Sequence, residues 1–165
     1  DTGELYQPED LNVIDFNEVG TAMLQDAVWA ESSWLADNED VAERFLRASF
    51  RGWVFCRDNF DACVDIVLNH GTTLGESHQR WQLNEINALI WPATNGIGVM
   101  NQELWDQTVE VATSQIPELQ GVEIPAEAFR TDLAEAAVAA LEAEGLEVTG
   151  EGFEKIEVEL TEGGS

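Results

Sequence analysis

The side chains that could do chemistry in this chain are mainly carboxylates. Glu18 and Asp26 stand out because each lies within or beside an apolar, strand-like stretch, where an exposed carboxylate is not the default. Ligands commonly meet a protein at strand ends, and Trp29 could stack on a flat ring beside these acids. The alternatives are a solvated strand end for the acids and a core position for the tryptophan. With so many acids, a carboxylate pair for glycoside hydrolysis can be found anywhere, so no catalytic residue is predicted.

The two cysteines, Cys56 and Cys63, form the second candidate group. On one continuous helix their Cα atoms would lie about 10 Å apart, beyond disulfide reach. A helix break between residues 58 and 60 would let the two sulfurs face each other, and a disulfide would indicate an oxidising compartment. Two small buried thiols are the alternative. Neither His70 nor His78 is spaced with the cysteines in a zinc pattern, so we predict no metal site and no cofactor.

A glycine-containing stretch, Asn95-Gly96-Ile97-Gly98, has a spacing faintly like that of a phosphate-binding loop. It lacks the third glycine, and no Lys-Ser or Lys-Thr pair follows it. We therefore interpret it as a turn.

The charge of the chain limits its partners. Thirty-three acidic residues against seven basic ones give a formal net charge of −26, which argues against nucleic acid and anionic membranes. No apolar run approaches the roughly 20 residues that span a bilayer, so no membrane insertion is predicted, and the first residues lack the features of a signal peptide. We interpret the acidity as a sign of a saline or extracytoplasmic habitat; a surface selected only for solubility is the alternative.

Five helices are expected from apolar spacing and end signals. The first follows Asn38 and carries an apolar stripe, and the second runs from Asp58-Asn59 to Gly71. The third runs from Glu76 to Ile90, where Trp91-Pro92 closes it. A fourth follows the cap residue Asn101 to about Ser114, and a fifth opens at Pro125 and ends at Gly145. The expected stripes are Val41, Phe45, Ala48, Gly52 and Cys56 in the first helix and Phe129, Leu133, Ala137, Ala140 and Leu141 in the fifth.

Three strands are expected near the two ends of the chain, over residues 11–16, 23–30 and 156–160. A sheet of these strands alone would be small and poorly covered. We therefore favour an α/β fold, rich in helices, whose other strands lie outside this chain, over a helical α+β domain. Residues 1–10 are expected to be a flexible or cut end, residues 11–160 the folded portion, and residues 161–165 a flexible tail.

Two long segments of the chain also resemble a known protein family. The segment VIDFNEVGTAMLQDAVWAESSWLADNEDVAERFLRASFRGWVFCRDNFDACVDIVL, continued by HQRWQLNEINALIWPATNGIGVMNQELWDQTVEVA, resembles the C-terminal half of ABC-transporter substrate-binding proteins. The similar members are those for thiamine pyrimidine precursors, nitrate, sulfonates and taurine. Phe60 departs from the family, which usually has proline there. The resemblance implies a Venus-flytrap fold of the periplasmic-binding-protein type II, with two lobes that close on a small ligand around a hinge.

The resemblance also implies a function. The protein would be no enzyme, but an extracytoplasmic carrier that delivers a small-molecule ligand to an ABC permease. Its partners would be that permease and the N-terminal half of the same protein, in the periplasm or outside the cell, with a lipid anchor on a missing N-terminus as one option. Residues 17–30 resemble the return crossing between the lobes, so the transferred ligand-binding candidates are Asn17, Glu18, Gln25, Asp26 and Trp29.

Two other functions stay open. One is an enzyme of the same fold that forms pyrimidines, which would need a histidine and an iron-binding cluster. The other is a helical interaction domain of a larger assembly, which explains the helices but leaves the strand-like segments unexplained. A pairing of two copies through exposed edges is a related expectation.

Overall fold

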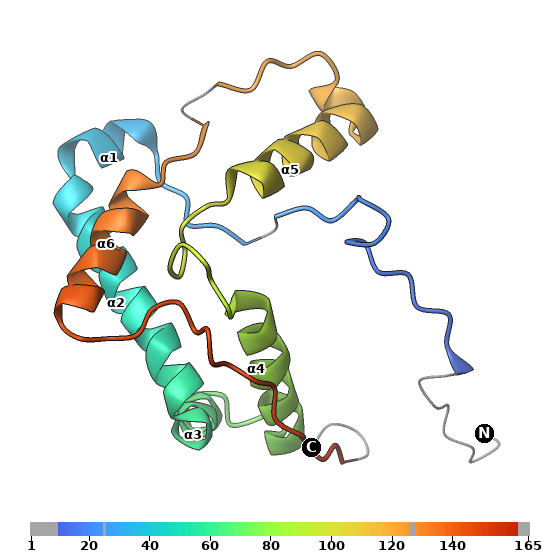
Figure 1. The fold of residues 1–165 in the computed structure, drawn as a ribbon, viewed down its shortest axis with the longest axis vertical. Coiled ribbons are helices and arrows are strands. Elements are labelled where there is room, and N and C mark those ends of the chain that lie inside the picture. Colours follow the sequence, from blue (N-terminus) through green and yellow to red (C-terminus); the bar gives the residue numbers. More distant parts are fainter. Residues whose placement is uncertain (1–9, 25, 126–127, 162–165) are drawn as a thin grey trace. The chain divides into compact units, whose positions relative to one another are not determined.

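The computed structural model describes residues 10–24, 26–125 and 128–161. Within them the chain forms six α-helices, the 3₁₀ turn η2 (Pro117–Leu119) and no strand. The predictions for residues 1–9 and 162–165, and for Gln25, lie outside the described residues. The helices are α1 (Ser32–Asp37), α2 (Glu39–Asp58), α3 (Phe60–His70), α4 (Glu76–Ile90), α5 (Gln102–Gln115) and α6 (Asp132–Ala143) (Figure 1).

The chain divides into two compact units. Unit 1 comprises Asp1–Trp29 and Met100–Phe129 and contains α5 and η2. Unit 2 comprises Ala30–Val99 and Arg130–Ser165 and contains the other five α-helices. The chain therefore passes between the units three times, after Trp29, Val99 and Phe129.

The predicted α/β class is wrong, and so is the periplasmic-binding-protein type II fold that the resemblance implies, because the three strand-like segments find no strand to pair with among the described residues. An extended segment forms a ladder only against a second extended segment in register. Here helix side chains take that place. In unit 2, the amide of Asn84 on α4 donates to the carbonyl of Ile156 and accepts from its N–H, at 2.8 and 3.1 Å. The hydroxyl of Ser77, also on α4, accepts from the N–H of Thr161 at 2.9 Å. The tail thus lies extended but is bonded to a helix.

Most helix positions follow the sequence signals. The expected helix over residues 76–90 is confirmed as α4, and the side chain of Asn101 caps α5 by accepting from the N–H of Leu104 at 3.1 Å. Helix α1 was not expected. Pro125 does not open the last helix, which begins only at Asp132. Acidic side chains in that first turn favour this start, because they face the positive end of the helix dipole.

The expected stripe of α2 faces solvent rather than the core. Val41, Phe45, Ala48 and Gly52 are all exposed, and the buried residues of α2 are Phe50 and Val54. The spacing of apolar residues shows only that a helix has an apolar face. Helix α2 has two such faces, and the buried one is the face that packs against α6. In α6 the expected stripe is confirmed at Ala137 and Leu141, which are buried together with Ala134 and Val138.

The core of unit 2 joins α2 and α6 to the connections between helices. It contains Phe50, Val54, Trp91, Ile97, Ala134, Ala137, Val138, Leu141 and Val148. The glycine stretch is confirmed as a turn, and it inserts Ile97 into this core. Gly98 has φ +76°, and a Cβ there would lie 2.2 Å from the Phe50 ring. The turn therefore needs glycine both for its backbone conformation and for its close approach to the core.

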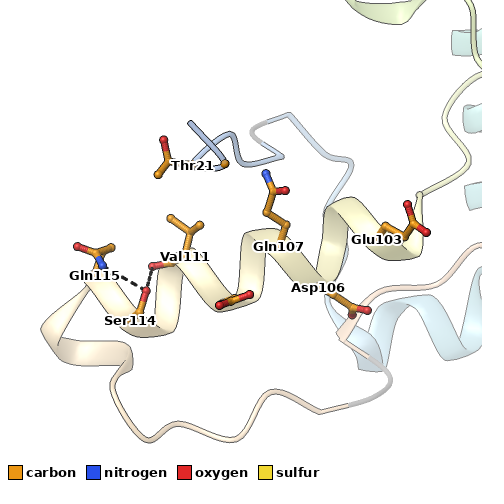
Figure 2. A pocket seen from close by; sticks show the side chains of 9 residues that line it. Thr21, Glu103, Asp106, Gln107, Val111, Ser114 and Gln115 are labelled. Carbon is orange, nitrogen blue, oxygen red and sulfur yellow. Dashed lines mark hydrogen bonds between the residues drawn. The ribbon is translucent and has the colours of Figure 1, made fainter. Parts of the chain in front are cut away.

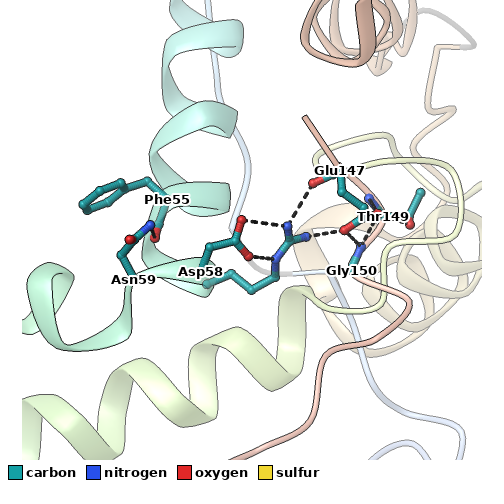
Figure 3. Close-up of polar contacts among 7 residues, drawn as sticks. Phe55, Asp58, Asn59, Glu147, Thr149 and Gly150 are labelled. Atoms are coloured by element: carbon teal, nitrogen blue, oxygen red, sulfur yellow. Dashed lines mark hydrogen bonds and ion pairs between the residues drawn. The ribbon is translucent and has the colours of Figure 1, made fainter. Parts of the chain in front are cut away.

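The end of α2 is fixed by a disulfide and by an arginine whose side chain is largely enclosed. Figure 3 shows Asp58 at this end of α2 and Glu147, Thr149 and Gly150 from the chain beside it. Cys56 and Cys63 are joined, with their Cα atoms 5.1 Å apart, so the bond links α2 to α3. The side chain of Arg57 is 9% exposed and contacts Asp58 and Glu147 at 2.7 Å each. Its guanidinium also lies 4.6 Å from the Trp91 ring centroid. Burial opposes the charged form of Arg57, but these acids outweigh it and raise its pKa.

Candidate functional site

The predicted ligand-binding residues lie along a segment of unit 1 that is exposed to solvent. Asn17 and Glu18 belong to a turn, in which the backbone N–H and side-chain amide of Asn17 donate to Asp15 at 2.7 and 3.0 Å. These hydrogen bonds, chiefly that of the Asn17 N–H, lower the pKa of the Asp15 carboxyl. Asp26 is exposed, and Trp29 is 78% exposed. The structure therefore does not gather these four residues into one pocket.

A hollow lies next to that turn. It has a volume of about 560 Å³ and is lined by the chain at Gly20 and Thr21 and by side chains of α5 (Figure 2). Figure 2 shows Gln107 and Val111 pointing from α5 toward the segment that carries Thr21, whereas Asp106 points to the other side of the helix. The lining side chains of α5 are Glu103, Asp106, Gln107, Glu110, Val111, Ser114 and Gln115.

Two polar side chains of α5 hold the extended segment beside the hollow. The amide of Gln107 donates to the carbonyl of Ala22 at 2.6 Å, and the hydroxyl of Thr108 accepts from the N–H of Leu24 at 2.9 Å. The same hydroxyl donates to the carbonyl of Leu104 within α5. A helix thus bonds the backbone of a strand-like segment, as α4 does with the tail in unit 2. This clamp sets where Gly20 and Thr21 stand above α5.

The electrostatics of the hollow are one-sided. Unit 1 contains no lysine, arginine or histidine, so all seven basic residues of the chain lie in unit 2. Three carboxylates border the hollow, Glu103, Glu110 and, from the other side of α5, Asp106, and no basic side chain of unit 1 balances them. Carboxylates accept hydrogen bonds and attract positive charge. The wall can therefore accept hydrogen bonds from amino groups or hold a cationic ligand, and it disfavours anions.

The sequence prediction covers residues 17–30 but not α5, the helix that bears most of the side chains lining the hollow. The acids on α5 were overlooked because acids are abundant throughout the chain and so carry little information singly. A more informative signal in the sequence is where basic residues are missing. Neither of the two stretches that form unit 1 contains a basic residue, and the 70 residues between them contain five of the seven Lys and Arg residues of the chain.

Among the described residues, no group of three or more His, Cys, Asp or Glu side chains could hold a metal ion. None of the described helices combines the length and apolarity that crossing a bilayer requires. Comparisons of the chain with protein-family models, with curated proteins and with solved structures find no match.

Proposed function

We propose that the chain is the helical part of an extracytoplasmic solute-binding protein, which holds a small organic ligand at unit 1 and passes it to the permease of an ABC importer. The observation that carries this proposal is the acid-lined hollow on α5. It lies beside the segment in which the family resemblance places ligand-binding residues, although it is lined by other side chains.

Exposed apolar surface in the same unit supports a second part of the proposal. Val13, Ile14 and Phe16 are all more than 60% exposed, and Trp29 is as exposed as Val13, at 78%. Exposed apolar patches mark places where another polypeptide binds, and Val13, Ile14 and Phe16 are neighbours in the chain. The partner proposed here is the N-terminal half of the same protein, which would cover this segment and close the hollow into a cleft.

The disulfide supports the proposed location. Disulfides persist in oxidising compartments and are rare in the reducing cytosol. The bond between Cys56 and Cys63 therefore supports a location in the periplasm or outside the cell.

The negative charge of the hollow favours some of the ligands that the resemblance suggests over others. Nitrate and sulfonates are anions and would meet three carboxylates without a basic side chain from unit 1. An aminopyrimidine can donate hydrogen bonds from its amino group to those carboxylates. We therefore favour a neutral or cationic ligand such as an aminopyrimidine or thiamine.

The test is a thermal-shift titration of the chain with an aminopyrimidine, thiamine, taurine and nitrate, because a ligand that binds only the folded state raises the melting temperature. The expected result is a rise with an aminopyrimidine or thiamine, reduced in Glu103→Gln, whose side chain lines the hollow. The control is Glu118→Gln, a change of the same charge in η2, outside the hollow. A response to taurine or nitrate alone, or to no compound, would count against the proposal.

A helical interaction domain is the second candidate, and the exposed stripe of α2 favours it. Val41, Phe45, Ala48, Gly52 and Phe55 follow at spacings of four and three residues and are all exposed. This spacing matches the seam of paired helices. Light scattering at micromolar protein in about 0.5 M salt, which screens the charge, should then give a mass above 18.2 kDa. Phe45→Glu should restore the monomer mass, whereas Leu89→Glu, an exposed apolar residue of α4, should not. A monomeric wild type would exclude this self-association.

A further inference from the structure

A second hollow lies on α5 and differs in character from the first. It has a volume of about 530 Å³, and its walls include two aromatic rings, from Trp105 and Phe129. The ring centroids lie 4.8 Å apart and the ring planes are inclined by 46°, so the rings form a corner. Val109, Ile124 and Pro125 extend this wall with aliphatic groups. The resulting surface suits alkyl or ring groups of a ligand.

Carboxylates stand beside this apolar wall. Asp106 and Glu110, one helical turn apart on α5, line this hollow as well as the first. Figure 2 shows Asp106 on the side of α5 that faces away from Thr21. The amide of Gln102 donates to Oδ1 of Asp106 at 2.8 Å, which orients the carboxylate but brings no charge. The hollow therefore combines an aromatic corner with two negative charges that no basic residue of unit 1 balances.

This combination excludes most ligand classes on physical grounds. An anion would be repelled, and a neutral apolar molecule would leave the two carboxylates without a counter-charge. An inorganic cation would gain little from the aliphatic wall. A positive charge near an aromatic ring is attracted by the electrons of the ring face, and alkyl groups on that cation bury apolar area against the wall. An organic ammonium ion satisfies both requirements.

We propose that this hollow binds a small organic ammonium ion, with its alkyl groups against Trp105 and Phe129 and its charge near Asp106 and Glu110. The inference goes beyond the proposed function, because it adds a second site on α5 with a ligand class of its own. The binding itself is a property of unit 1 and can be measured independently.

The experiment titrates the ¹⁵N-labelled full chain with choline at constant ionic strength. The readout is the indole N–H resonance of Trp105, identified by its loss in Trp105→Phe. The matched probe is 3,3-dimethyl-1-butanol, which has the shape of choline without its charge. The expected result is a saturable shift with choline and binding of the neutral probe weaker by about tenfold or more.

Variants locate the binding. Asp106→Asn with Glu110→Gln should weaken choline binding about tenfold while keeping the shape of the site, whereas Glu118→Gln should leave it unchanged. Trp105→Ala should abolish binding as followed by calorimetry, with circular dichroism to check that α5 persists. Equal affinity for the two probes, choline binding unaffected by the loss of both carboxylates, or no saturable shift up to about 100 mM choline would each overturn the inference.

The outcomes separate this inference from the proposed function. A thermal shift with an aminopyrimidine that depends on Glu103, together with no choline effect on Trp105, would support solute binding and exclude the ammonium site. Choline binding that depends on Trp105, with no response to the solute panel, would support the ammonium site and count against the proposed ligands.

Discussion

Units 1 and 2 differ in what stabilises them. Unit 2 buries a cluster of apolar side chains and has a disulfide, and its arginines make ion pairs with neighbouring acids. In unit 1, none of the described residues is buried, and apolar side chains such as Val13 and Trp29 are largely exposed. Unit 1 also has acidic residues without any basic residue to pair with them.

The difference indicates which unit depends on something outside itself. Burial of apolar area is the main favourable term in folding, and unpaired like charges oppose a compact state. Unit 2 buries apolar area and pairs its acids with arginines of its own, so it needs no other molecule for its stability. Unit 1 does neither, so a ligand, a cation or another polypeptide would stabilise it more than it would stabilise unit 2. This is consistent with placing both proposed ligand sites in unit 1.

The largest expected effect comes from a cavity in the core of unit 2. Leu141 on α6 is 0% exposed, so Leu141→Ala should lower the free energy of unfolding by about 2–5 kcal/mol. Leu104→Ala on α5, where the side chain is 45% exposed, should lower it by less than about 1 kcal/mol. Urea unfolding followed by circular dichroism measures both changes. Similar losses for the two variants would contradict the contrast between a packed and an unpacked unit.

A smaller effect is expected from two glycines with similar backbone conformations. Gly98 in unit 2 and Gly121 in unit 1 have φ of +76° and +77°. A Cβ at Gly98 meets the Phe50 ring, whereas at Gly121 it meets no atom within 4 Å. Gly98→Ala should therefore cost roughly 2–4 kcal/mol, from strain and overpacking, and Gly121→Ala about 1 kcal/mol, from strain alone. Equal costs in urea unfolding would mean that the core does not press on the glycine turn.

The smallest effect concerns the acid that pairs with Arg57. Burial opposes ionisation of Glu147, but donors from Thr149 and Gly150, together with Arg57, outweigh burial and lower its pKa from 4.5. Because the folded-state pKa is lowered, the stabilisation is fully present above about pH 4.5 and is lost as pH falls through the folded value.

The measurement compares melting temperatures of the wild type and Glu147→Gln from pH 7 to pH 3. The wild type should melt higher at pH 7, and its advantage should shrink below about pH 4.5. Glu118→Gln in unit 1 controls for the loss of one negative charge. An advantage of the wild type that grows on acidification would show that the ion pair at Arg57 does not stabilise unit 2.

Local signals in the sequence determined the positions of several helices. Asn101 caps α5 because its side chain satisfies a free N–H of the first turn, and Trp91-Pro92 ends α4 because proline disfavours a helical residue before it. These effects involve neighbours in the chain, so they can be predicted without the fold. The acidity of the chain was also visible at once, although its uneven division between the units was not.

The tertiary structure decided which surfaces are buried and which segments pair. The stripe with Val41 and Phe45 and the face with Phe50 and Val54 are both apolar, and only packing against α6 selects the second. The strand-like segments have the right local pattern, but a strand forms only with a partner strand in register. Here Asn84 bonds Ile156, and Thr108 bonds Leu24, so helices take the place of the partner strand. The first hollow on α5 exists only because folding brings the segment with Gly20 and Thr21 against this helix, where Gln107 bonds a residue 85 positions away in the sequence. The second exists only because the chain after α5 folds back so that Ile124, Pro125 and Phe129 face the helix.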